Sequence, residues 1–226
     1  NFIDNVQFIA NEFLLYNGFS IGISDCIATK TTEIQNVIDK CFIEAKTIEE
    51  NTEDKRIQEI RVNASLSKAR DHGMRIAKEA LHGDNNFIST VTSGSKGDYF
   101  NIAQITGLLG QQNFSGQRIH YSLNNNKRAL PHYSMDELSK EEEYESKGFI
   151  KNSFIHGLNP KEFWFHAITG REGVTDTAMK TAQSGYVQRR MVKVGEDVTI
   201  ANDGTVRGAN QQIIQFQYGG DGLDPI

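Results

Sequence analysis

A long stretch without proline, from residue 161 to residue 224, most constrains what this chain can fold into, and its first half has the pattern of one helix. Asn159 can cap the free amides at the helix start, and Pro160 suits the first helical position because no amide is needed there. Glu162, three residues after Asn159, completes a capping box. We therefore predict a helix over residues 159–196, which at about 1.5 Å per residue spans about 50 Å, about two to three times an ordinary globular helix.

Three glycines interrupt this helix, at Gly170, Gly173 and Gly185. Each interior glycine costs about 1 kcal/mol relative to alanine. Two explanations stay open at this point. Either another part of the protein packs so closely against the helix that only glycine leaves room, or the helix must bend or let a ligand lie against its backbone.

The end of the same helix combines small, aromatic and basic side chains. Thr181 and Ala182 form a smooth patch, Tyr186 can stack on a base, and cations that suit phosphate groups stand beside them. The candidate nucleic-acid-facing residues are Lys180, Thr181, Ala182, Tyr186, Arg189 and Arg190. A basic helix end also stabilises the helix dipole, so the pattern has a purely structural explanation as well.

Two further helices are predicted before the long one. Apolar residues spaced by three and four predict a packed helix over residues 31–48. Its apolar positions are Ile34, Ile38, Cys41, Ala45 and Ile48. The polar string NTEDK ends this pattern, and a second helix is predicted over residues 54–82, so the pair should form an antiparallel hairpin.

The remaining segments are shorter. The glycine-rich string SGSKG precedes a helix that begins near Asp98, whose carboxylate favours the positive end of a helix. NFSGQRIHYSL is predicted to be extended after a turn, and SMDELSKEEEYESKG to be a solvated connector. A hairpin is expected around Asp203, and alternation in QIIQFQY predicts a half-buried strand. The predicted fold class is α+β, mainly helical, with short antiparallel strands near the C-terminus.

Composition narrows the class of protein. Of 226 residues, 38% are hydrophobic and 23% are charged, which fits a globular chain with a core. No apolar run of membrane-spanning length and no secretory leader is recognisable, and the chain does not begin with Met, so we expect a piece of a longer protein. Cys26 and Cys41 are predicted to be buried free thiols rather than a disulfide. The net charge of −5 argues against nucleic-acid binding over the whole surface but allows a local basic stripe.

Several strings together resemble one protein family. GREGVTDTAMKTAQSGYVQRR resembles the bridge helix of the largest (β′-type) subunit of multisubunit DNA-dependent RNA polymerases. NGFSIGISD, SGSKGDYFNIAQITGLLGQQ, RALPHYS, KGFIKNSFIHGLNPKEFWFHA and IIQFQYGGDGLDP resemble the same subunit in the same order. The eukaryotic, archaeal and large-DNA-virus branch fits best. Thr169 stands where many relatives carry a glycine, which suggests a divergent, viral polymerase.

The resemblance implies three regions and a role for each. Residues 1–158 would form the pore and funnel region, with residues 31–82 as the funnel helices. Residues 159–196 would be the bridge helix, and residues 197–226 would begin the following cleft region with a β-hairpin. Lys96 would contact the incoming nucleotide, and Thr181 and Ala182 would abut the nascent base pair. Lys180, Tyr186, Arg189 and Arg190 would face the template.

A further group of residues matches pore-side and bridge-helix positions. These residues are Gln104, Gln111, Gln112, His166 and Glu172. Ordinary buried hydrogen bonding explains each of them equally well. For Lys96, a lysine on a surface turn is the alternative explanation.

The resemblance also defines what the chain lacks. The family holds its catalytic metals with three aspartates in the string NADFDGD, which is absent here, as is the mobile trigger loop. Mg²⁺ would therefore be held by residues outside this chain, and the chain would be part of a DNA-directed RNA polymerase, a nucleotidyltransferase, without catalysing alone. Implied partners are the DNA template, the RNA product, nucleoside triphosphates, and the second-largest and other polymerase subunits, with no membrane.

One alternative function stays open, namely a non-catalytic nucleic-acid-binding helical scaffold protein that merely shares long helices. A partner chain carrying the triple-aspartate loop would distinguish the two. The expected location is intracellular, in the nucleus for a host polymerase and in the cytoplasm or the virion for a viral one.

Overall fold

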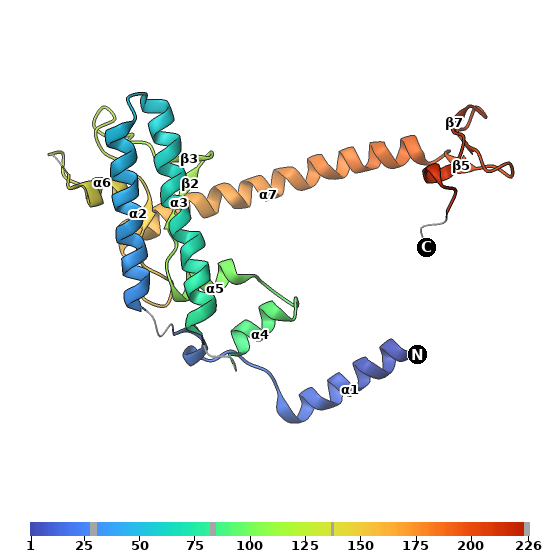
Figure 1. Cartoon of the computed structure of the whole chain (residues 1–226), viewed down its shortest axis with the longest axis horizontal. Coiled ribbons are helices and arrows are strands. Elements are labelled where there is room, and N and C mark those ends of the chain that lie inside the picture. The colour runs from blue at the N-terminus through green and yellow to red at the C-terminus, as the bar shows by residue number, and fades with distance from the viewer. Residues whose placement is uncertain (28–30, 82–84, 137, 224–226) are drawn as a thin grey trace. The chain divides into compact units, whose positions relative to one another are not determined.

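The computed structural model describes residues 1–27, 31–81, 85–136 and 138–223. The chain divides into two compact units, residues 1–170 and residues 171–226, and each is considered by itself. Helices dominate, and the described strands are two or three residues long. The predicted α+β, mainly helical class is confirmed (Figure 1).

The first unit begins with helix α1, Phe2–Asn17, and the 3-10 turn η1, Ile23–Cys26. Asn1 caps α1 because its side chain accepts a hydrogen bond from the amide of Ile3. No side chain of α1 is buried, although the helix is rich in Phe, Ile and Leu. Helix α1 therefore adds nothing to the described core.

Helices α2, Thr31–Asn51, and α3, Lys55–Ala80, lie side by side as the predicted antiparallel hairpin (Figure 1). Ile38 and Ala45 of α2 pack against Val62 and Leu66 of α3 in one buried cluster. Asp54 caps α3 by accepting a hydrogen bond from the amide of Arg56 at 2.8 Å. The last residue of the predicted second helix, residue 82, lies outside the described residues.

Both cysteines are free thiols, as predicted. Cys41 is buried in the hairpin core, whereas Cys26 is only half-buried, so the prediction of burial holds for Cys41 alone. Burial raises the pKa of both thiols. Neither thiol is therefore activated as a thiolate.

Helices α4, Asn86–Thr92, and α5, Tyr99–Thr106, pack at the C-terminal end of α3. The chain then forms β1, Gly110–Gln111, β2, Asn113–Phe114, and β3, Gln117–Arg118. β2 and β3 are an antiparallel hairpin whose turn residues Ser115 and Gly116 have φ of 51° and 77°. β1 pairs with β4, Phe149–Ile150, through Gly110↔Ile150 and Gln111↔Phe149. The predicted extended segment after a turn is therefore confirmed.

The segment predicted to be a solvated connector instead contains helix α6, Lys140–Ser146. Ser139 and Glu142 form a capping box at its start. Tyr144 is buried, with its ring 5.2 Å from the ring of Phe42 in α2. The prediction was wrong because the run of glutamates concealed one aromatic residue that packs into the core.

Helix α7, Pro160–Gly195, confirms the long helix. Glu162 donates its amide to the side chain of Asn159 at 2.9 Å, and the carboxylate of Glu162 accepts the amide of Asn159 at 3.0 Å. This is the predicted capping box. The boundary between the two compact units falls after Gly170, within α7, and so differs from the predicted region boundaries. The functional division of the chain at residues 158 and 196 stays a prediction.

The second unit also contains a small antiparallel sheet of β5, Thr199–Ile200, β6, Val206–Arg207, and β7, Ile213–Gln215, followed by the 3-10 turn η2, Tyr218–Gly220. The predicted hairpin is confirmed, and Asp203 in its turn accepts the amide of Thr205 at 3.0 Å. The predicted strand is present as β7, but the prediction that it is half-buried is wrong. Ile214 is 55% exposed and Phe216 is 83% exposed, because no described element of this unit covers the sheet there.

Candidate functional site

The candidate surface is the second part of α7. Every side chain from Gly173 to Gly195 is exposed. A Cβ atom built on Gly170, Gly173 or Gly185 would meet nothing within 4 Å. Packing within the described residues therefore does not explain the three glycines. A bend of the helix, or the approach of a ligand or partner outside the described residues, remains as the explanation.

Hydroxyl groups along this part of α7 bond back to the helix itself. Thr177 donates to the carbonyl of Gly173 at 2.9 Å, and Thr181 donates to the carbonyl of Thr177 at 2.8 Å. Ser184 donates to the carbonyl of Thr181 at 3.2 Å. Such bonds weaken and bend helices slightly and leave the methyl groups of threonine on the surface. The result is a smooth strip of small side chains next to Gly185.

Helical geometry brings only some of the predicted nucleic-acid-facing residues together. At about 100° per residue, Tyr186 and Arg189 lie within about 40° of Ala182 around the helix axis. Thr181 and Arg190 flank this direction on opposite sides, at about 80–100°. The guanidinium of Arg190 lies 5.6 Å from the centre of the Tyr186 ring. Tyr186, Ala182 and Arg189 thus form one face, which we call the α7 face.

Lys180 does not belong to the α7 face. It lies about 160° around the helix from Ala182. Its ammonium forms an ion pair with the carboxylate of Asp176, and this hydrogen bond raises the pKa of Lys180. The charge of Lys180 is therefore partly neutralised and directed to another side of the helix.

Lys96 lies in the loop between α4 and α5. Gly94 and Gly97 have φ of 71° and 72°, a conformation that favours glycine, so the loop turns tightly on either side of Lys96. The amide of Lys96 donates to the carbonyl of Thr90 at 3.3 Å, and its side chain is exposed. No carboxylate among the described residues forms an ion pair with it.

The amino end of α5 is not free to bind an anion. Asp98 caps the helix, and its carboxylate accepts the amide of Asn101 at 3.0 Å. A negative charge thus already occupies the helix end at which a phosphate would otherwise be favoured. Any phosphate contact in this loop therefore depends on the Lys96 ammonium rather than on the helix end.

A network of buried polar groups joins β1 and β2 to the start of α7. Gln111 donates to the carbonyls of Gln112 and Lys147, both at 2.9 Å. The side-chain oxygen of Gln112 lies 3.2 Å from Nδ1 of His166. Burial lowers the pKa of His166, which favours the neutral imidazole. Gln111, Gln112 and His166 are therefore all engaged in structural hydrogen bonds.

The neighbouring candidates complete this picture. Thr169, the residue that stands where the resemblance expects glycine, donates its hydroxyl to the carbonyl of Asn113 at 3.2 Å. Gln104 is half-buried in α5, and its backbone carbonyl accepts the amide of Phe154 at 3.1 Å. Glu172 is half-buried on α7 within the second unit. The structure thus brings Gln112 and His166 into contact.

Glu162 has a larger role than the sequence indicated. Besides closing the capping box, its carboxylate accepts hydrogen bonds from the amide of Lys151 at 3.2 Å and the side chain of Asn152 at 2.9 Å. The residue is 7% exposed. A capping box is readable from local sequence, but contacts with residues ten or eleven positions earlier are not.

The described residues contain no group of three or more His, Cys, Asp or Glu side chains that could hold a metal ion. The part of the chain that the structure describes therefore does not fit a Mg²⁺ site. No described helix combines the length and the apolarity needed to cross a membrane.

Comparison with protein families assigns the chain. Residues 42–150 match the family described as RNA polymerase Rpb1, domain 4, and residues 157–224 match RNA polymerase Rpb1, domain 5. The chain belongs to the Rpb1 family. The Rpb1 domain 4 match runs from the second half of α2 to β4, and the Rpb1 domain 5 match begins just before α7. The chain is thus part of the largest subunit of a DNA-directed RNA polymerase, as the resemblance implied.

Two viral relatives of the Rpb1 family align with nearly the whole chain. The "Probable DNA-directed RNA polymerase II subunit RPB1 homolog" of Invertebrate iridescent virus 6 is 48% identical over 239 residues. The "Putative DNA-directed RNA polymerase 008R" of Frog virus 3 (isolate Goorha) is 41% identical over 225 residues. Each alignment covers 99% of this chain but only 23% and 17% of the two relatives. The chain therefore spans less than a quarter of the Rpb1 relatives it matches.

Proposed function

We propose that this chain acts within an assembled DNA-directed RNA polymerase, where α7 lies against the template and the nascent base pair as a bridge helix. The observation that carries the proposal is the open, fully exposed surface of α7 around Gly173 and Gly185. Three costly glycines with no neighbour in the described residues are accounted for if nucleic acid approaches the helix backbone or the helix bends during translocation.

The α7 face has the chemistry that this role requires. Ala182 and Gly185 leave room for a base pair, Arg189 supplies a cation for a phosphate, and Tyr186 supplies a ring for stacking. Thr181 keeps its hydroxyl bonded to the helix, so it presents a methyl group rather than a competing donor. Contacts of this kind do not read base sequence, as a polymerase requires. Thr181, Arg190 and Lys180 are the weaker candidates, since they lie off this face.

An apolar side of α7 supports the presence of partner subunits. Val187, Met191 and Val194 are exposed apolar residues on the side of α7 away from Ala182. A contiguous apolar surface of this kind is typical of a helix that is covered within an assembly. We infer that other polymerase subunits, including the second-largest, complete the enzyme, with DNA, RNA and nucleoside triphosphates as its ligands. An intracellular location, in the cytoplasm or the virion of a virus, goes with this function.

Residues 1–158 would line the pore that admits nucleotides, and Lys96 would contact the triphosphate. We expect Lys96→Ala in the assembled polymerase to lower the apparent efficiency of nucleotide use by about ten- to a hundredfold, because a charge-assisted phosphate contact is lost. Template binding should change much less. Single-nucleotide addition kinetics and a DNA-binding titration measure the two effects.

Lys127 offers a matched control, since it is also an exposed lysine in a loop. Lys127→Ala should leave both measurements unchanged. If Lys96→Ala instead weakens DNA binding while nucleotide efficiency stays constant, Lys96 belongs to the template path and not to the pore.

The chain alone should synthesise no RNA. The described residues hold no cluster of metal ligands, and the proposal assigns Mg²⁺ to residues of the polymerase outside this chain. The check is an extension assay of purified chain with a primed template, nucleotides and Mg²⁺. Template-dependent extension by the chain alone would disprove the assignment of Mg²⁺ to residues outside this chain. If the chain is instead a non-catalytic scaffold protein, no extension should occur even after other polymerase subunits are added.

A further inference from the structure

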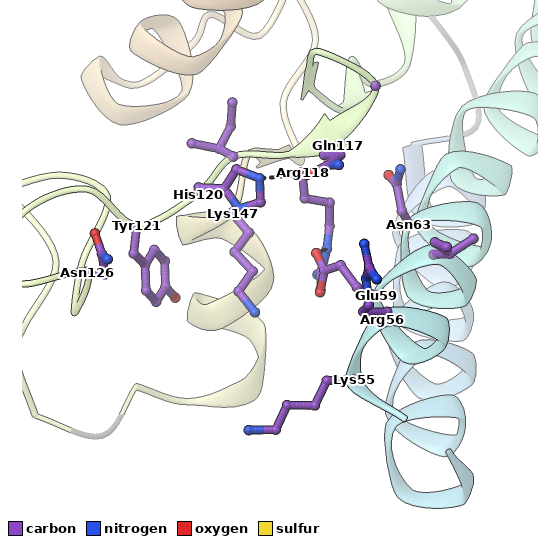
Figure 2. A pocket seen from close by; sticks show the side chains of 13 residues that line it. Lys55, Arg56, Glu59, Asn63, Gln117, Arg118, His120, Tyr121, Asn126 and Lys147 are labelled. Carbon is purple, nitrogen blue, oxygen red and sulfur yellow. Dashed lines mark hydrogen bonds and ion pairs between the residues drawn. The ribbon is translucent and has the colours of Figure 1, made fainter. Parts of the chain in front are cut away.

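A cavity with no lining residue from α7 lies between the start of α3 and the segment around β3 (Figure 2). Its volume is about 910 Å³, within the range of small-molecule sites. Lys55, Arg56 and Asn63 approach from α3, and Arg118 and Tyr121 approach from the opposite wall (Figure 2). None of the motifs in the sequence indicated this cavity.

The lining of the cavity is strongly positive. Lys55, Arg56, Arg118 and Lys147 line the cavity together with one carboxylate, that of Glu59, and the ammonium of Lys147 pairs with Glu143 outside this lining at 3.1 Å. This concentration stands out because the chain as a whole carries a net charge of −5. A neighbouring cavity of about 310 Å³ shares Glu59, Arg118 and Lys147, but there four lysine or arginine residues are balanced by four glutamates. The excess of positive charge is therefore specific to the larger cavity.

Arg118 is the buried base of this site. It is 2% exposed, and its Nε and Nη2 atoms donate to the carboxylate oxygens of Glu59 at 2.6 and 2.5 Å. Its Nη1 atom is buried and has no hydrogen-bond partner among the described residues. The side-chain oxygen of Asn63 is also buried without a partner there. One donor and one acceptor in the lining thus remain unsatisfied, which is costly unless a ligand or water meets them.

The cations on the outer part of the cavity are available. Lys55 and Arg56 are exposed, and neither forms an ion pair with a carboxylate of the described residues. His120 bonds to the side chain of Gln117 at 2.8 Å, whereas the ammonium of Lys147 is engaged with Glu143 at 3.1 Å and lies 5.8 Å from the Tyr121 ring (Figure 2). Several positive groups and one aromatic ring therefore surround one small volume.

We propose that this cavity binds the polyphosphate group of a small molecule, either inorganic polyphosphate or a nucleoside polyphosphate. A polyphosphate concentrates several negative charges within a few ångströms, which suits convergent cations better than an extended acidic peptide with one charge per residue of about 3.3 Å. Glu59 already fills the bidentate side of Arg118, so a single phosphate oxygen suits the remaining Nη1 donor. Neither Lys96 nor any residue of α7 lines this cavity.

Lysine acetylation of the assembled polymerase, read by mass spectrometry residue by residue, tests this proposal. Inorganic triphosphate should slow acetylation of Lys55, which lines only the larger cavity, by about threefold or more, and leave Lys46 and Lys140 of the balanced cavity unchanged. Arg56→Gln should raise the triphosphate concentration needed for half protection by about fivefold. The protection should persist in Lys96→Ala, so its failure is distinguishable from failure of the proposed pore.

Further arms separate the ligand sources. If adenosine triphosphate protects at a lower concentration than inorganic triphosphate, and Tyr121→Leu removes this difference, the ligand is a nucleoside polyphosphate. If the two protect at equal concentrations, the ligand is the inorganic group. Three results overturn the proposal: no protection at Lys55, protection by a hexaglutamate peptide but not by triphosphate, or equal slowing at Lys46, which would indicate general charge screening.

Discussion

We expect an assembled polymerase carrying Ala182→Leu to elongate RNA on the order of 100-fold more slowly than the wild type, because displacement of reacting groups by about 1 Å has an effect of that size. Leucine would place a branched side chain on the α7 face, next to Gly185, where the proposal puts the nascent base pair. Stability should hardly change, since Ala182 is exposed and an added side chain there overpacks no core. Elongation rate and thermal unfolding of the same preparation provide the measurement.

Ser184→Leu is the matched control for this experiment. Ser184 is also small and exposed, but it lies about 160° around the helix from Ala182. Its substitution should leave elongation within about twofold of the wild type if the α7 face alone meets nucleic acid. Equal slowing by both substitutions would mean that bulk anywhere on α7 is harmful, and the assignment of one face would then be wrong. A destabilised Ala182→Leu enzyme whose folded fraction elongates normally would place Ala182 in packed surroundings instead.

Local interactions explain why parts of the fold were predictable. Helix α7 was predictable because its start depends on a local capping box of Asn159 and Glu162 and no proline interrupts the sequence that follows. The hairpin of α2 and α3 follows from apolar spacing for the same reason. Helix α6 obeys the same rules through Ser139 and Glu142, and it was missed because the charge of the segment was given more weight than its cap.

Tertiary surroundings explain what the sequence could not decide. Glycine in a helix signals either close packing or open space, and only the empty volume around Gly170, Gly173 and Gly185 separates the two. Alternation in β7 identifies two faces of a strand, but burial of one face requires a covering element that the described residues do not provide. Arg118 and Glu59 are 59 positions apart in the chain, so no local pattern reveals their pairing or the cavity beside it.

The site shows the same division between sequence and structure. The resemblance supplied the Rpb1 family and the residues on α7, and the family match confirms the former. It assigned Lys180 together with its neighbours, whereas helical periodicity and the ion pair with Asp176 separate Lys180 from Ala182. Residues that are adjacent in a helical sequence rarely lie on the same face of the helix. A role assigned to a whole string therefore applies only to those residues of the string that share one face.

The largest loss of stability is expected from Glu162→Ala. The Glu162 carboxylate is buried and accepts hydrogen bonds from the backbone amides of Lys151, Asn152 and Asn159 and from the side chain of Asn152. Removing it leaves these donors without an acceptor at the point where α7 begins. We expect the free energy of unfolding to fall by about 3 kcal/mol, a value typical of breaking a buried, charged hydrogen-bond network. Urea unfolding of the chain, followed by circular dichroism, measures it.

Glu142→Ala is the comparison that isolates the buried network. Glu142 closes an equivalent capping box at α6, with the amide of Ser139 3.1 Å from its carboxylate, but this glutamate is exposed. Its removal costs only a cap that water can replace, so the midpoint of unfolding should shift much less than in Glu162→Ala. Glu162→Gln should lie between the two, because an amide oxygen still accepts a hydrogen bond from Asn159 or Asn152 but lacks the negative charge. If Glu162→Ala and Glu142→Ala shift the midpoint equally, Glu162 is an ordinary helix cap, and the start of α7 is held in the first unit by the packing of Phe165 against Tyr133 instead.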